Sequence, residues 1–80
     1  MERDQWLEAF AREAGVSAPD ADEIERLLAL AGTAAHASER TAAPITCWIA
    51  GRSPRALSEL LDAAARLAQA DQAEASSSQD

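Results

Sequence analysis

The spacing of the apolar residues constrains the fold of this chain most strongly. Leucine, isoleucine, alanine and aromatic residues recur at intervals of three and four along most of the sequence, and no segment alternates apolar and polar residues with a period of two. The first pattern is typical of amphipathic α-helices and the second of β-strands. Because only three glycines and three prolines interrupt it, the sequence predicts an all-α fold with four helices.

The first predicted helix spans about residues 4–14, and Gly15 is suited to end it. The second is the longest and runs to about Arg40, with Asp20 or Asp22 as a possible N-cap. At 100° per residue one apolar stripe continues along it, formed by Ile24, Leu27, Leu28, Ala31, Ala35 and Ser38. The stripe stays in register across Gly32, which favours one unbroken helix and a close neighbour there; a break at Gly32 is the alternative.

The third predicted helix, about residues 44–50, is apolar on all sides. Such a helix has to be surrounded, so we expect it at the centre of a compact four-helix bundle, with Ile45, Trp48 and Ile49 in the core. A fourth helix should follow from Pro54 to about residue 69. Residues 1–69 are thus predicted to form one helical domain, and the polar residues 70–80 a disordered tail.

Charge and composition narrow the possible partners. The chain carries 14 acidic residues, seven arginines and no lysine, which gives a net charge of −7. Nucleic acids and anionic membranes bind mainly to clustered positive charge, so we expect neither as a partner. No segment reaches the ~20 apolar residues of a membrane span, and the N-terminus lacks the apolar core of a secretory signal. These features predict a cytoplasmic protein.

Few side chains are suited to metal binding or catalysis. Cys47 is the only cysteine and His36 the only histidine, so we expect no disulfide, no metal site and no cofactor. A serine or cysteine nucleophile with His36 as its base is disfavoured, because His36 projects away from Ser38 on the helical wheel. The sequence therefore predicts no catalytic residue and no enzyme.

The polar stretch between the second and third helices contains the candidate binding residues His36, Glu39 and Arg40. Our main interpretation is a structural corner, in which Glu39 accepts hydrogen bonds from amides at the start of the third helix. His36 and Arg40 would bond the last carbonyls of the second helix. The second interpretation is a small partner or anion site formed by the same three residues.

The second helix has apolar residues on two sides. Leu30 lies roughly opposite the main stripe, with Ala34 and Ala37 near it. Either this helix is central in the bundle, or its second side meets another chain. Because 80 residues rarely supply core for both sides of a helix, we expect Leu30, Ala34 and Ala37 to form an interface with a protein partner or a second copy.

Three strings of the sequence carry a family resemblance: WLEAFAREAGV at residues 6–16, EIERLLALAG at 23–32 and AAHASERTAAPITCWIAG at 34–51. Over about residues 5–67 the chain resembles a family of small helical domains with no assigned chemistry. Members occur as short separate proteins or as a C-terminal extension of molybdenum-cofactor guanylyltransferases. The resemblance implies an association with molybdopterin-guanine dinucleotide biosynthesis, in which the neighbouring transferase attaches GMP from GTP to molybdopterin with magnesium.

This chain has neither the strands nor the glycine-rich nucleotide loop that such a transferase needs. The leading hypothesis is therefore a non-enzymatic accessory domain that binds a guanylyltransferase or a related maturation protein. Two alternatives remain open, namely a small structural homo-oligomer unrelated to the cofactor, and a weak anion- or nucleotide-binding module.

Overall fold

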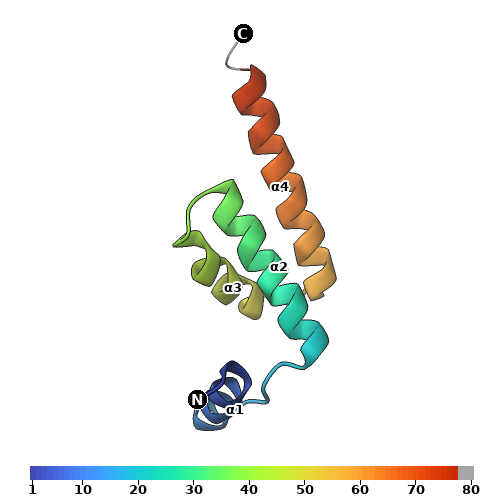
Figure 1. Ribbon diagram of the computed structural model, residues 1–80. Coiled ribbons are helices and arrows are strands. Elements are labelled where there is room, and N and C mark those ends of the chain that lie inside the picture. The colour runs from blue at the N-terminus through green and yellow to red at the C-terminus, as the bar shows by residue number, and fades with distance from the viewer. Residues whose placement is uncertain (78–80) are drawn as a thin grey trace.

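The computed structural model describes residues 1–77, and within them the side chains of residues 1–73. Residues 1–77 form four helices and no strand, which confirms the predicted all-α fold class. The helices are α1 (Arg3–Ala14), α2 (Ala21–Ala37), α3 (Ala42–Arg52) and α4 (Leu57–Ser77). Figure 1 shows them in chain order from blue to red.

A glycine backbone angle explains where α1 ends, and side-chain hydrogen bonds explain where α2 begins. Gly15 adopts the left-handed φ of 78° that glycine tolerates, and it ends α1 as the sequence predicts. A capping box starts α2, because the Asp20 carboxylate accepts from the Glu23 amide at 2.8 Å and Glu23 accepts from the Asp20 amide at 2.9 Å. The helix continues through Gly32, as predicted. No neighbouring atom lies within 4 Å of the place where a Cβ on Gly32 would stand, so close packing does not explain this glycine.

Three helix ends differ from the prediction by three residues or more, and α3 is two residues longer at each end than predicted. α2 ends at Ala37 and not at Arg40, since Ser38 has φ −133° and ψ −98°. α4 starts at Leu57, because the Ser53 side chain accepts from the Arg55 amide at 3.1 Å and holds a turn there. α4 then runs to Ser77, eight residues beyond the predicted end, through residues that are rich in alanine and include no glycine or proline. Of the predicted tail, residues 78–80 lie outside the described part.

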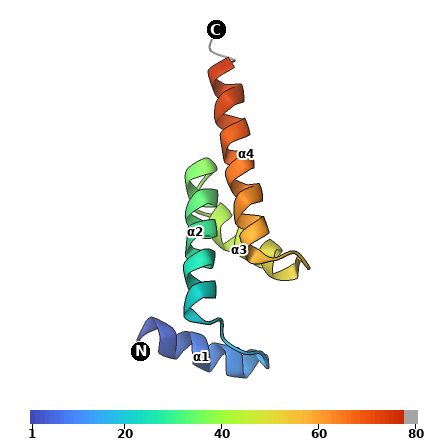
Figure 2. The same cartoon turned by 90° about the vertical axis from the view of Figure 1, so that its right-hand side faces the viewer.

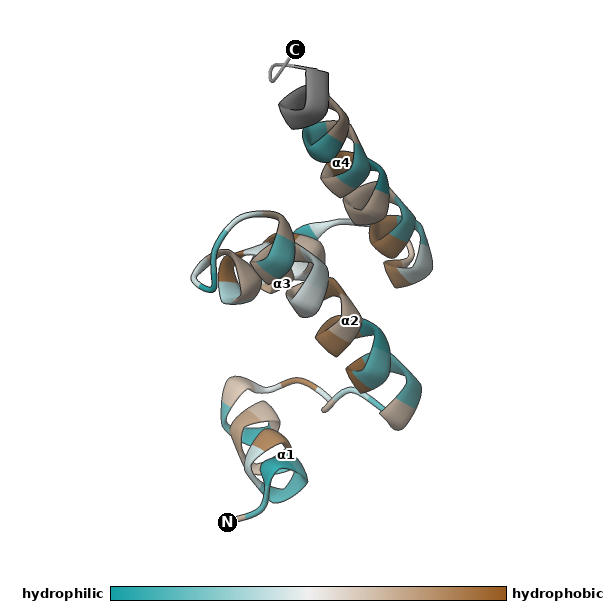
Figure 3. Cartoon of the chain, turned by 45° about the horizontal axis from the view of Figure 1, so that its top comes forward, coloured by the Kyte–Doolittle hydropathy of each residue, from teal (hydrophilic) through white to brown (hydrophobic). Residues whose placement is uncertain are grey.

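α2 packs against α3 on one side and α4 on the other. α3 runs back along α2, so α2 and α4 point in the same direction, and α4 projects past the end of α2 (Figures 1 and 2). α1 lies crosswise at the other end of α2, away from this three-helix unit (Figure 2). Figure 3 shows the amphipathic character of α2, with brown residues on one side and teal residues on the other.

The centre of the fold is α2, and the prediction that α3 occupies it is wrong. Among the side chains described, only Ala11 and Leu30 are buried, and Leu30 is 2% exposed. Ile45, Trp48 and Ile49 are all exposed. The physical reason is that α3 is covered by α2 on one side only, so one face of an apolar helix stays in contact with solvent.

The chain is elongated rather than compact. Its radius of gyration is 15.1 Å and its principal extents are 52 × 26 × 18 Å, whereas a compact domain of this length has a radius of gyration of about 12 Å. The projecting end of α4 and the separate position of α1 account for the difference (Figure 2). A fold this open leaves large apolar side chains without internal neighbours.

Candidate functional site

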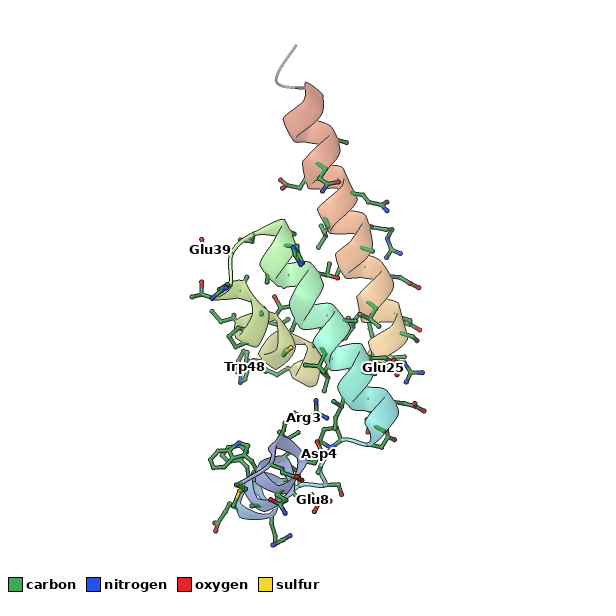
Figure 4. The ribbon with its side chains drawn as sticks, in the orientation of Figure 1. Arg3, Asp4, Glu8, Glu25, Glu39 and Trp48 are labelled. Carbon is green, nitrogen blue, oxygen red and sulfur yellow. The ribbon has the colours of Figure 1, made fainter. Side chains whose placement is uncertain are left out.

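The most prominent exposed feature is one face of α3. Ile45, Trp48 and Ile49 are 60%, 62% and 59% exposed. Together with Arg52 they occupy positions i, i+3, i+4 and i+7, which lie on one side of a helix. We call these four residues the α3 outer face. Figure 4 shows Trp48 on the side of α3 that points away from α2.

The opposite side of α3 carries small side chains and meets the rest of the fold. The Cys47 sulfur lies 3.9 Å from the Leu27 carbonyl oxygen of α2, and Thr46 borders a hollow with residues of α2 and α4. Small residues let α3 approach α2 closely, while its large residues are left outside. The sequence therefore folds α3 with its apolar bulk toward solvent.

The α3 outer face lies in the longest stretch of the chain that has no acidic residue. Residues 40–58 contain Arg40, Arg52 and Arg55 and neither aspartate nor glutamate, although the whole chain carries −7. The Arg52 guanidinium carbon lies 4.7 Å from the centroid of the Trp48 ring, within range of a cation–π contact. This face is thus apolar at its centre and positively charged at its edge.

A second exposed apolar group lies on α1. The rings of Trp6 and Phe10, four residues apart, stack at 6.1 Å with an interplanar angle of 13°, and the two side chains are 57% and 59% exposed. We call them the α1 aromatic pair. Figure 4 shows Asp4 and Glu8 on the side of α1 nearest the loop to α2. Trp6 and Phe10 follow them by two positions and so project from the other side.

The predicted corner residues do not form one site. His36, Glu39 and Arg40 are all exposed. His36 borders a hollow with residues of α4 that include Asp71 and Gln72, and neither Glu39 nor Arg40 reaches it. Glu39 lies in the loop between α2 and α3 (Figure 4), where it accepts a 3.5 Å hydrogen bond from the Thr41 hydroxyl.

The corner is also built by other bonds than those predicted. The Glu39 and Arg40 carbonyl oxygens accept from the amides of Ala42 and Ala43 at 2.9 and 3.1 Å, so the backbone itself forms the turn into α3. Within residues 1–77, the side chains of His36 and Arg40 make no hydrogen bond to the end of α2.

The predicted interface on α2 requires a correction. Leu30 was expected to face a partner, and it is instead the most deeply buried large side chain that the structure describes. Ala34 and Ala37 line a hollow between α2 and α4 together with Ala64 and Ala68. This side of α2 is therefore occupied by the chain's own helices, and α2 is packed on two sides.

The remaining candidates for chemistry are sparse. Among the residues described, no three histidine, cysteine, aspartate or glutamate side chains come together as a group that could hold a metal ion. Cys47 is partly buried against α2. No helix in the described part of the chain is both long enough and apolar enough to cross a membrane.

Comparison with models of known protein families finds one match. The model of a family described as a domain of unknown function, DUF6457, matches residues 1–77. The chain belongs to the DUF6457 family. The match extends beyond the predicted resemblance at both ends and fits a family of small domains without assigned chemistry. No curated protein and no solved structure matches the chain.

In this DUF6457 domain, sequence reasoning missed the α3 outer face because α3 is apolar on every side. A usable signal was present in the difference of side-chain size around the helix. Ala43, Cys47 and Ala50 share one side, whereas the large residues share the other with Arg52. An arginine that continues a stripe of large apolar residues indicates a face in contact with solvent or with another protein.

Proposed function

We propose that this chain is a non-enzymatic protein-interaction domain that acts in the cytoplasm and binds a molybdenum-cofactor guanylyltransferase. The observation that supports a protein-interaction domain is the α3 outer face, where three large apolar side chains are exposed. Apolar groups gathered on one face in this way are common at protein interfaces. The guanylyltransferase as the partner rests on the family resemblance of the strings around HASER and APITCWIAG.

The composition of this face suits a binding surface. Tryptophan and arginine are the residues most enriched among those that dominate binding energy, and Trp48 lies beside Arg52. Arg52 places a positive charge at the edge of this face, which favours a partner surface that carries acidic residues. The partner surface that fits is an apolar patch edged by carboxylates.

The test is calorimetric titration of the purified guanylyltransferase with the chain and with two variants. Trp48→Ala should weaken binding by about 30-fold or more, because a central aromatic residue contributes about 2 kcal/mol or more. Leu67→Ala is the matched control, since Leu67 is also a large exposed apolar residue but lies on α4. It should change affinity less than about threefold.

Two results would count against the proposal. If the unmodified chain shows no heat of binding to the guanylyltransferase, the partner is wrong. If Trp48→Ala and Leu67→Ala weaken binding equally, the surface is wrong. Circular dichroism of each variant separates a lost contact from a lost fold.

A further inference from the structure

We propose that two copies of this chain associate reciprocally, with the α1 aromatic pair of each copy packed on the α3 outer face of the other. The inference goes beyond the proposed function, because it concerns the chain alone and requires no guanylyltransferase. Three features support it: the amount of exposed surface, the matching shapes of the two apolar groups and the charges around them.

The solvent-exposed area is larger than that of a compact monomer of the same mass. The chain exposes 6406 Å² at 8.5 kDa, whereas a compact monomer of that mass exposes about 4,700 Å². The difference is about 1,700 Å², and a standard interface covers about 800 Å² on each partner. An interface of ordinary size with a second copy would therefore cover about half of this excess.

The two apolar groups are complementary in form. The α1 aromatic pair is a ridge of two stacked rings four residues apart on a helix. The α3 outer face presents Ile45 and Ile49, also four residues apart, with Trp48 beside them. Rows of side chains spaced by four residues are the ones that interlock when helices pack in their commonest geometry. Each copy offers both groups, so a two-fold arrangement makes the contact twice.

The charges around the two groups favour the same pairing. Arg52 lies at the edge of the α3 outer face, whereas Glu2 and Glu13 lie four positions before Trp6 and three after Phe10, on the side of α1 that carries the aromatic pair. A chain of net charge −7 repels a second copy in most orientations. Placing α1 of one copy against α3 of the other joins a negative segment to a positive one, which favours this orientation over others.

The conformation of the chain leaves both groups available. α1 meets the rest of its own chain at a hollow lined by Leu7, Pro19 and Ile24, near the loop that leads into α2. The α1 aromatic pair lies outside that hollow. Because the same α3 face serves the proposed function, a guanylyltransferase would have to displace α1 of the second copy, and the dimer is the form free of that partner.

The first test measures the mass of the pure chain by light scattering during gel filtration. Interfaces of this size have dissociation constants in the micromolar range or below, so at about 100 µM the mass should be twice 8.5 kDa. Both tryptophans of the sequence lie in the proposed contact, so dilution should shift their fluorescence to longer wavelength as the mass falls. A mass of 8.5 kDa at every concentration overturns the proposal, whether α1 stays apart or closes on its own α3.

The second test identifies the contact itself by a disulfide between copies, with one cysteine placed in each of the two groups. In a Cys47→Ala background, one batch carries Phe10→Cys and a second batch carries Ile49→Cys. Mixed under mild oxidation, they should form a disulfide between copies on the order of 100-fold faster than Phe10→Cys mixed with Leu67→Cys, because contact raises the local thiol concentration to the millimolar range. Equal rates of disulfide formation in the two mixtures would show that α1 of one copy does not pack on the α3 outer face of the other.

Discussion

Replacing Leu30 with alanine tests where the core of this chain lies. Leu30 is 2% exposed, and the removed atoms leave a cavity that the surrounding structure fills only in part. Substitutions of this kind cost about 2–5 kcal/mol. A domain of 80 residues has a free energy of unfolding of about 4–12 kcal/mol. We therefore expect Leu30→Ala to lower it by about 3 kcal/mol, a large share of the total.

Leu28→Ala is the matched control. Leu28 lies on the same helix and is 58% exposed, so the same atoms are removed and the change in helix propensity is equal. We expect a loss below about 1 kcal/mol. Urea unfolding followed by circular dichroism measures both, at one chain concentration because association adds to apparent stability. Equal losses, or a larger loss for Leu28→Ala, would refute the position of the core.

The other predictions concern the helices themselves and use the same unfolding measurement. Gly32→Ala should raise the free energy of unfolding by about 0.5–1 kcal/mol, since Gly32 lies inside α2 with room for a Cβ; a loss would indicate a neighbour at that position. Asp20→Ala should lower it by about 1 kcal/mol by removing the cap on the Glu23 amide, and no change would mean that the capping box does not stabilise α2. Glu59→Ala should cost less than about 0.5 kcal/mol, because its ion pair with Arg55 is exposed on both sides; a cost above 1 kcal/mol would contradict this.

Local sequence signals predicted the helices well. Gly15 ends α1 and Asp20 caps α2 because these residues act through their own backbone angles and hydrogen bonds, which depend on near neighbours alone. The continuity of α2 through Gly32 followed from the stripe of apolar residues. Where prediction failed locally, as at the start of α4, a competing local bond from Ser53 decided the outcome.

The side of α2 that faces inward could not be predicted from the same signals. Leu28 and Leu30 differ by 200° around the helix, and both belong to plausible apolar stripes. Which of them is buried depends on where α3 and α4 pack, and that is set by contacts between distant segments. The helical wheel predicted that the stripe with Leu28 faces inward, because that stripe holds more large apolar residues. The structure buries Leu30, and of the other stripe it leaves Leu28 exposed and Leu27 half-buried.

The prediction about α3 failed in a way that is informative about its partner. A helix that is apolar on all sides is expected to be surrounded, and within the described chain α2 covers one side of it. The sequence rule and the structure agree if the remaining side is covered by another molecule. That molecule has to bring apolar side chains and tolerate arginines at the edge. The α1 aromatic pair, with acidic residues along the same helix, has both properties, and a guanylyltransferase would need an equivalent surface to take its place.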